Sequence, residues 1–402
     1  MTRPEVLPDA AAASAMSERI ALSVPHLQGH EWAYVKECLD TGWVSSVGPF
    51  VDRFEREVAA FVGSAHAVAV ASGTAGLHMA LAVVGVRPGD EVLVSDLTFV
   101  APANAIRYCQ AEPVFVDVEP RTWQMDVSTV ERFLRACPRG SEGCRNPRTG
   151  RRIAALLPVH ILGMACDIER LSALGREFGV PVVEDAAEAM GVRCGGRHAG
   201  TFADAGVFSF NGNKVITCGG GGIVVTPRRE LAAKLRYLTT QAKDDPLEYI
   251  HHEVGYNYRL TNLQAALGCA QLEQLPRFLA RKRAIAQGYA AALRDVDALT
   301  LMPQPAGVEA TWWLYTVLLP MGTTVPQRQA ILRRLHAQGV EARPLWHPLH
   351  ALPPFRACEQ LGIEHAPDLY ARAVSLPSSV GLTDAQVERC ARALTDALAD
   401  LR

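Results

Sequence analysis

Short apolar runs alternate with amphipathic stretches along most of the chain. Apolar residues recur at i, i+3, i+4 and i+7 over residues 73–84, which predicts a helix, whereas the mainly apolar run 91–95 predicts a buried strand. On the same grounds the expected strands are 65–71, 91–95, 113–118, 153–159, 181–184, 206–210 and 223–226. The expected helices are 30–41, 73–84, 102–109, 128–136 and 168–178.

Strands that alternate with helices predict right-handed βαβ units and an α/β fold whose sheet is mixed but largely parallel. Beyond about residue 275 the pattern changes. A helical stretch over 278–293 is followed by shorter segments at 313–319, 333–338 and 386–399, which indicate a smaller α+β C-terminal domain. We therefore expect a flexible N-terminal arm (1–20), a large domain (21–275) and a small domain (276–402).

The composition is that of a soluble globular enzyme and does not favour a nucleic-acid-binding, disulfide-rich or metal-binding protein. The 402 residues are 49% hydrophobic and 20% charged, and the net charge of −2 does not suggest a surface that binds polyanions, so nucleic acid is not expected as a partner. Ten cysteines are scattered without a CxxC pair, which indicates reduced thiols in a reducing compartment, and no His/Cys cluster has the spacing of a metal site.

No membrane partner is expected. The stretch 66–86 has no Asp, Glu, Lys or Arg, but Ser72-Gly73-Thr74 interrupts it, so a strand, a turn and a helix fit better than a membrane span. The N-terminus lacks the basic start and long apolar core of a signal peptide. A cytoplasmic location is predicted.

One lysine stands where a solvated side chain is hard to explain. Lys214 closely follows the apolar run 205–208 and precedes the glycine block 219–222. An amine held in a pocket loses hydration, and this makes it a better nucleophile towards a carbonyl. Such an amine can form a Schiff base with pyridoxal phosphate, a cofactor that also needs an acid at its pyridine nitrogen, donors for its phosphate and a surface on which its ring stacks.

Suitable partners follow other predicted strands. Asp185 directly follows the predicted strand 181–184 and could pair with the pyridine nitrogen. The turn 72–76 opens a helix and could bind the phosphate, with Ser209 as a further donor and Phe99 as a surface on which the ring stacks. Each position has an alternative: a helix cap or surface acid for the carboxylate, an N-cap for the turn, and core packing for the phenylalanine.

Five segments together resemble one family in order and content. They are SGTAGLHMAL, TFVAPANAI, VEDAAEAMG, SFNGNKVITCGGGGIVVT and GYNYRLTNLQAALG, and the resemblance extends from about residue 22 to residue 350. The chain is similar to the DegT/StrS sugar aminotransferases. The resemblance implies PLP fold type I, as in aspartate aminotransferase, with pyridoxal phosphate as cofactor.

The resemblance also implies individual roles. Lys214 would be the Schiff-base lysine and proton shuttle, and Asp185 would pair with the pyridine nitrogen. Gly73, Thr74 and Ser209 would hold the phosphate. These five residues form the expected centre of the site.

Three further roles come from the same resemblance. Phe99 would stack on the ring, and Glu188 would lie beside the phenolic oxygen, where the family often has Gln or His. Asn257 would reach the phosphate of the neighbouring subunit, so a homodimer with shared active sites is implied. The family often has GEGG where this chain has Gly219–Gly222.

A narrower resemblance concerns the substrate. Residues 21–48 and 237–262 resemble the branch that aminates UDP-linked 4-keto-6-deoxy-N-acetylhexosamines in bacillosamine and legionaminic acid pathways. The expected reaction moves the amino group of L-glutamate to C4 of UDP-2-acetamido-2,6-dideoxy-hexos-4-ulose by a ping-pong mechanism. A GDP- or dTDP-linked keto sugar and a non-catalytic PLP-fold regulatory protein remain alternatives. The family's dehydratases carry histidine in place of the lysine, and Lys214 argues against that activity.

Contacts to the sugar are expected from loops. The family pattern indicates Trp43, Ser46, Val47, Lys243 and His350. Trp312 and Trp313 are expected to pack in the core. The polar insertion 138–152 is expected to be a solvated loop, with a basic clamp for a phosphorylated substrate as the alternative.

Overall fold

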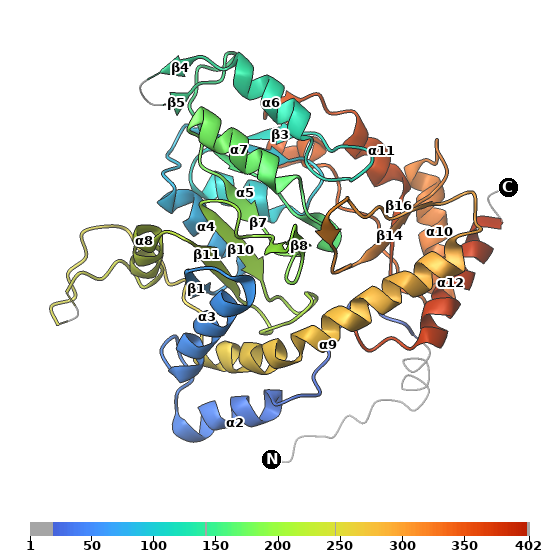
Figure 1. The fold of residues 1–402 in the computed structure, drawn as a ribbon, viewed down its shortest axis with the longest axis horizontal. Coiled ribbons are helices and arrows are strands. Elements are labelled where there is room, and N and C mark those ends of the chain that lie inside the picture. Colours follow the sequence, from blue (N-terminus) through green and yellow to red (C-terminus); the bar gives the residue numbers. More distant parts are fainter. Residues whose placement is uncertain (1–18, 141–142, 246, 400–402) are drawn as a thin grey trace, which may run out of the picture.

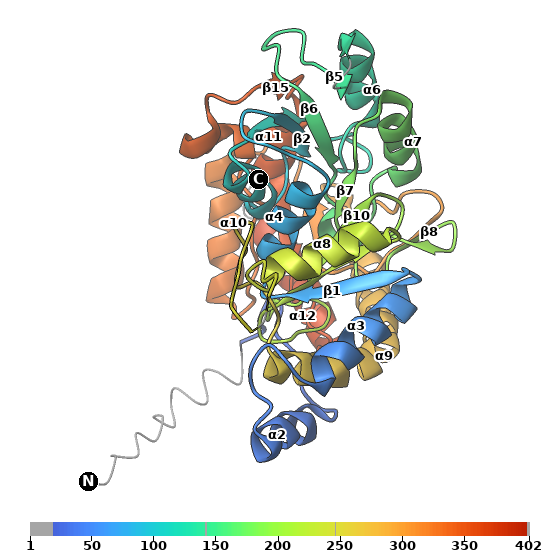
Figure 2. The same ribbon diagram turned by 90° about the vertical axis from the view of Figure 1, so that its left-hand side faces the viewer.

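The central layer of the molecule is an extended sheet (Figures 1 and 2). The computed structural model describes residues 19–140, 143–245 and 247–399. Two four-stranded sheets continue one another, since parallel bridges join Leu156 to Val182 and Val159 to Asp185. In spatial order the strands are β1 (His66–Val70), β11 (Gly222–Thr226), β10 (Ala205–Ser209), β7 (Val183–Asp185), β6 (Ile153–Leu157), β2 (Glu91–Ser95), β3 (Glu112–Val116) and β15 (Gln360–Leu361).

The sheet is largely parallel, as predicted. Strand β11 is antiparallel to both of its neighbours, β1 and β10, whereas the pairs from β10 to β15 are parallel. Parallel strands place their carboxyl ends at one edge, where ligands bind in folds of this class. The residues that follow β2, β7 and β10 therefore meet at one edge.

Helices cover both faces of the sheet. In β2, Val92 and Val94 are buried in one apolar cluster and Leu93 in another, because successive side chains of a strand point to opposite faces. The first cluster includes residues of α4 (Gly73–Val83), α5 (Ala101–Tyr108) and α8 (Arg229–Thr239). The second includes residues of α6 (Val127–Ala136) and α7 (Ile168–Phe178).

The longest helix links the two ends of the molecule (Figure 1). Helix α9 (Asn262–Leu293) begins at a capping box formed by Thr261 and Gln264, and packs on α2 (Glu31–Thr41) and α3 (Pro49–Val62). The sequence predicted only 278–293, although the helix runs through Pro276, a residue that usually breaks helices. Burial of residues on both sides of the proline holds the helix together instead. Helix α3 was not predicted.

The C-terminal part has its own antiparallel sheet, with the order β12 (Thr300–Leu301), β14 (Tyr315–Leu318) and β16 (Ala373–Leu376). Helices α10 (Val325–Ala337), α11 (His365–Arg372) and α12 (Asp384–Ala399) accompany it. The division at 275/276 stays a prediction: it falls within α9, and β15 from the C-terminal part pairs with β3 of the large sheet. Most of the predicted arm lies outside the described residues, and the Ile20 amide donates to the Gly339 carbonyl (2.8 Å).

Short elements complete the fold. Strands β8 (Arg193–Cys194), β9 (Arg197–His198) and β13 (Val308–Glu309) form a small sheet, and β4 (Arg139–Gly140) pairs with β5 (Gly143–Cys144) in the insertion. The 3-10 turns are η1 (Ile161–Gly163), η2 (Leu349–Ala351) and η3 (Pro353–Phe355). Among the helices that the structure describes, none has both the length and the apolar character needed to cross a membrane.

Candidate active site

A cavity of about 440 Å³ lies at the carboxyl ends of β2, β7 and β10. We call it the site cavity. It brings together residues that are far apart in the sequence, because parallel strands end at the same edge of the sheet. Seven predicted site residues line it: Gly73, Thr74, Phe99, Asp185, Glu188, Ser209 and Lys214.

Lys214 is held by the turn that follows β10. Its amide donates to the Asn211 carbonyl (3.0 Å), and its Nζ lies 3.3 Å from Oε1 of Glu188. The lysine side chain is 14% exposed and the glutamate side chain 6%. The amine is therefore partly screened from water and still lines the cavity.

Glu188 is the buried partner of this amine. Its second oxygen, Oε2, accepts from the Leu162 amide (2.8 Å), and Leu162 itself has a left-handed φ of 62°. Burial raises the pKa of the Glu188 carboxyl, although the Lys214 charge and the Leu162 amide oppose the shift. The carboxyl is thus set to exchange between an ionised form paired with a cation and a neutral form that donates a hydrogen bond.

Asp185 is the last residue of β7. It lies opposite Val207 in the parallel pairing with β10, and it is 3% exposed. Its Oδ1 accepts from the Ala187 amide (3.0 Å). Burial raises the pKa of the Asp185 carboxyl, and the Ala187 amide and the Lys214 charge only partly offset this effect. A cationic ring nitrogen is the kind of partner that would stabilise this carboxylate.

A second buried carboxylate lies directly before Asp185. Glu184 is fully buried and accepts hydrogen bonds from three backbone amides of the turn 200–203 and from Nε2 of His160 (3.0 Å). The Cys166 amide donates to Nδ1 of His160 (3.1 Å), and the His160 amide donates to the Asp185 carbonyl (2.9 Å). The pairing of Glu184 with His160 was not predicted, because partners so distant along the chain leave no local pattern.

The prediction for Trp313 was incomplete. The residue is 3% exposed and belongs to the core, as expected, yet it also lines the site cavity. Its ring centroid lies 4.2 Å from Lys214 Nζ, and its Nε1 donates to the Asn213 carbonyl (2.7 Å). Trp346 stacks nearly parallel to it (6.4 Å, 4°). The C-terminal part thus forms an aromatic wall of the site.

The part of the cavity that the start of α4 lines suits an anion. Helix α4 begins at Gly73, and Ser72 caps it by accepting from the Ala75 amide (3.0 Å). A Cβ on Gly73 would lie 3.0 Å from Cβ of Ser209, so the glycine allows the close approach of α4 and β10. Helix N-termini attract phosphate through their amides and dipole. Thr74 and Ser209 add hydroxyl groups beside this helix end.

The residues present fit pyridoxal phosphate. Lys214 supplies the amine, Asp185 a buried carboxylate, and the start of α4 an anion site in the same cavity. Phe99, which is 55% exposed, lines this cavity beside them and offers a ring face. Within the described residues, no group of three or more His, Cys, Asp or Glu side chains is placed to hold a metal ion.

Six predicted residues do not line the cavity of this single chain: Trp43, Ser46, Val47, Lys243, Asn257 and His350. His350 Nδ1 lies 2.7 Å from Oδ2 of the buried Asp96, and Lys243 Nζ lies 4.6 Å from the Tyr249 ring centroid. The roles of these six residues stay predictions.

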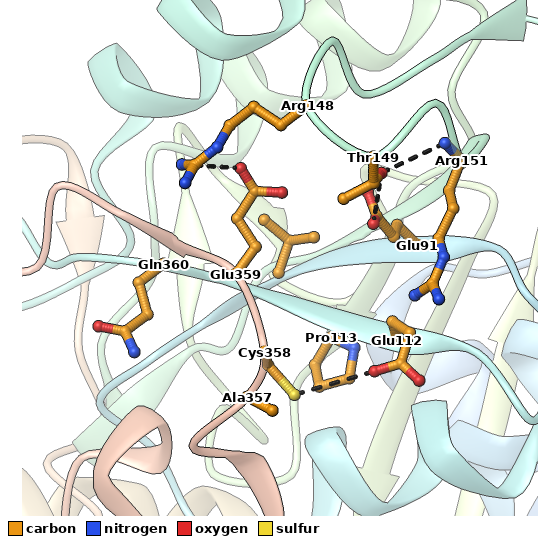
Figure 3. A pocket seen from close by; sticks show the side chains of 11 residues that line it. Glu91, Glu112, Pro113, Arg148, Thr149, Arg151, Ala357, Cys358, Glu359 and Gln360 are labelled. Atoms are coloured by element: carbon orange, nitrogen blue, oxygen red, sulfur yellow. Dashed lines mark hydrogen bonds and ion pairs between the residues drawn. The ribbon is translucent and has the colours of Figure 1, made fainter.

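The insertion 138–152 lies elsewhere. Figure 3 shows a separate pocket that Arg148, Thr149 and Arg151 of the insertion line together with Glu91 and Glu112. Its volume is about 390 Å³. Both glutamates begin strands, so this pocket is at the edge of the sheet opposite to the site cavity. The two cavities share no lining residue. A basic clamp at the catalytic site therefore has no support from this geometry.

Known proteins match the chain over nearly its full length. The family model of the DegT/DnrJ/EryC1/StrS aminotransferases matches residues 25–395. A GDP-perosamine synthase of Caulobacter vibrioides is 39% identical over 381 residues, which cover 94% of this chain and 98% of that protein. The putative pyridoxal phosphate-dependent aminotransferase EpsN of Bacillus subtilis is 39% identical over 373 residues (92% and 93%).

A solved structure confirms the architecture. The aminotransferase TlmJ from Streptoalloteichus hindustanus superposes with a TM-score of 0.86 at 31% identity, covering 95% of this chain and 99% of that one. The fold is therefore PLP fold type I, and the cofactor is pyridoxal phosphate. The narrower resemblance to the UDP-sugar branch finds no support among these relatives. The family model matches residues 25–395, so this chain belongs to the DegT/DnrJ/EryC1/StrS aminotransferase family and is a sugar aminotransferase.

Proposed function

We propose that this enzyme moves the amino group of L-glutamate to C4 of a nucleotide-linked 4-keto-6-deoxy sugar, with Lys214 as the reactive amine and Asp185 as the partner of the ring nitrogen. One observation carries the proposal. Lys214, Asp185 and the N-terminus of α4 line a single cavity, although they come from distant parts of the sequence.

The proposed reaction gives Lys214 and Asp185 different roles. Pyridoxal phosphate, when bound, supplies a carbonyl that takes up an amino group and an electron-poor ring that stabilises negative charge at the neighbouring carbon. Lys214 Nζ removes the proton from Cα of glutamate in the first half-reaction and delivers a proton to C4 of the sugar in the second. Asp185 keeps the ring nitrogen protonated. Ping-pong kinetics follow, because 2-oxoglutarate leaves before the sugar enters.

The relatives favour GDP as the nucleotide. Relatives at 39% and 37% identity, from Caulobacter vibrioides and Vibrio cholerae, are named GDP-perosamine synthases. We therefore place a GDP-linked keto sugar ahead of the UDP-linked sugar that the sequence suggested. The UDP- and dTDP-linked sugars remain as comparison substrates.

A homodimer would complete the site. Asn257 is exposed in the single chain and does not line the cavity. Apolar side chains near it and in the loop 42–48 are also exposed: Trp43, Val44, Val47, Leu247, Tyr249, Ile250 and Val254. Exposed apolar patches mark interaction sites. A second copy that covers them would bring Asn257 to the neighbouring phosphate site, together with the sugar contacts expected from Trp43, Ser46, Val47, Lys243 and His350.

A labelling experiment tests the reaction. Purified enzyme with pyridoxal phosphate and ¹⁵N-labelled L-glutamate is given the GDP-, UDP- or dTDP-linked 4-keto-6-deoxy sugar, and mass spectrometry follows ¹⁵N. Transfer to the GDP-linked sugar is expected, and Lys214→Ala should abolish it. Transfer to the UDP-linked sugar alone would restore the substrate that the sequence suggested. Failure to convert glutamate to 2-oxoglutarate would overturn the choice of amino donor.

A further inference from the structure

A buried lysine outside the site cavity holds the backbone of Trp313. Lys282 lies on α9 and is 2% exposed. Its Nζ donates to the Trp313 carbonyl (2.7 Å) and to the Ser378 carbonyl (2.5 Å). Within the described ranges it has these carbonyl acceptors and forms no ion pair with a carboxylate.

Burial of this amine is costly. A charged ammonium without a carboxylate partner is disfavoured inside a protein, and burial lowers the pKa of Lys282 to about 7. An apolar side chain of similar length would fill the same space without that cost. What the lysine adds is its N–H groups, which both its charged and its neutral form can donate to the two carbonyls.

The backbone that Lys282 holds is strained. Trp312 has a left-handed φ of 54°, which is unfavourable for a bulky residue. Such a conformation persists only when its surroundings hold it in place. The Thr311 amide donates to the Gly163 carbonyl (3.0 Å) on one side of Trp312, and Lys282 binds the Trp313 carbonyl on the other.

This strained segment carries the indole that touches the reactive amine. The Trp313 ring lies 4.2 Å from Lys214 Nζ, and its N–H is bonded to the Asn213 carbonyl. An aromatic face at this distance attracts a cation and shields it from solvent and reagents. The position of the Trp313 backbone therefore affects how much of Lys214 is free to react.

We propose that Lys282 is a positioning residue, whose bonds to the Trp313 and Ser378 carbonyls hold the Trp313 indole against Lys214. The inference rests on the proposed function only in taking Lys214 as the reactive amine. Lys282 itself touches neither the site cavity nor Lys214. It affects Lys214 only indirectly, through its hydrogen bond from α9 to the backbone of Trp313.

Chemical labelling of the cofactor-free chain tests this. Acylation by a limiting amount of acetic anhydride at pH 7.5 is read by mass spectrometry, with the exposed Lys36 as internal standard. Trp313→Leu and Lys282→Met should each raise the labelling of Lys214 relative to Lys36 by roughly two- to fivefold, since a contact of this kind is lost. The double variant should show no more than the single ones, because Lys282 acts through Trp313.

Two controls separate positioning from general loosening. Tyr289→Phe removes a neighbouring buried bond from the same helix, between the Tyr289 hydroxyl and the Pro377 carbonyl (2.8 Å), and should leave Lys214 labelling unchanged. If Lys282→Met does not fold, Lys282→Gln, which keeps an N–H donor, replaces it and should give a smaller increase. The proposal would be overturned if Lys214 labelling stayed unchanged in the Lys282 variants. It would also be overturned if the increase in the double variant equalled the product of the increases in the two single variants. Because no cofactor or substrate is present, failure of the aminotransferase assay would not affect this result.

Discussion

Lys214 Nζ lies 3.3 Å from the buried Glu188 carboxylate, whose other oxygen is held by the Leu162 amide. Burial raises the pKa of this carboxyl, so it tends to become neutral when the lysine loses its positive charge. A neutral carboxyl can donate a hydrogen bond to an oxygen of the bound cofactor. The Glu188 carboxylate, which pairs with Lys214 in the cofactor-free enzyme, would thus become a neutral hydrogen-bond donor when the cofactor is bound.

Glu188→Gln should therefore be tolerated better than Glu188→Leu. Glutamine keeps an acceptor for the Leu162 amide and a donor for the cofactor, whereas leucine keeps neither. We expect kcat/KM to fall less than about tenfold in the glutamine variant and about 100-fold in the leucine variant. Steady-state kinetics with glutamate and the keto sugar measure both. Equal losses in the two variants would argue against a hydrogen-bonding role.

Asp185→Asn should stabilise the cofactor-free chain and inactivate the enzyme. Burial raises the pKa of Asp185 in the folded state, so the folded chain is penalised when this carboxyl ionises. The penalty builds up as the pH rises from the ordinary aspartate value through the raised one. At pH 8 the variant should gain about 1 kcal/mol in its free energy of unfolding, and this gain should vanish in strong acid.

Urea unfolding of the cofactor-free chain across pH measures this effect. The exposed Asp295 provides a matched control, since Asp295→Asn should leave the pH dependence of stability unchanged. A destabilised Asp185→Asn variant at pH 8 would show that the carboxylate is better satisfied than its burial indicates.

The buried Lys282 should make stability depend on pH in the alkaline range. Its pKa is about 7 when folded, whereas an unfolded lysine titrates near pH 10, so the unfolded chain binds more protons between these values. Wild-type stability relative to Lys282→Met should therefore rise by about 2 kcal/mol between pH 7 and pH 9. Lys36→Met, at an exposed position, should run parallel to wild type. Parallel curves for Lys282→Met as well would mean that Lys282 titrates normally.

Two adjacent glycines at the cavity should differ in tolerance. Gly221 has a φ of +104°, and a Cβ there would lie 2.6 Å from Leu260 Cδ1, whereas a Cβ on Gly220 would meet only the flexible Gln264 Nε2, at 3.2 Å. Gly221→Ala should lose about 1–3 kcal/mol of stability, and Gly220→Ala less than about 0.5 kcal/mol. Gly220→Glu, the residue common in the family, should also fold. Thermal unfolding of the three variants decides, and equal losses would contradict the local geometry.

The proposed homodimer with shared active sites predicts complementation between inactive variants. Lys214→Ala lacks the reactive amine, and Asn257→Ala would lack the phosphate contact given to the neighbour. When the two variants are mixed in equal amounts and pair at random, half of the dimers contain one chain of each kind. Each of these mixed dimers has one intact site out of two, so activity should recover to about a quarter of the wild-type value. Subunits refolded together and assayed by ¹⁵N transfer provide the test. No recovery would place Asn257 in the site of its own chain or outside the site altogether.

Local patterns were enough for the layered part of the fold. The run 91–95 and the helix 168–178 match β2 and α7 at both ends, because apolar periodicity and flanking turn residues are local properties. Helix α9 exceeded its prediction across Pro276, since its continuity depends on packing against α2 and α3. The low helix propensity of one proline carries no information about that packing.

The sequence by itself determined which residues we propose for the chemistry. Lys214 after one strand, Asp185 at the end of another, and Gly73 at the start of a helix were identified from their places in the strand–helix alternation, and they line one cavity. Only the tertiary structure decided what surrounds them. Trp313 reaches Lys214 from the C-terminal part, and Lys282 reaches Trp313 from α9. Contacts between residues so far apart arise from packing between elements, and no pattern of neighbouring residues encodes them.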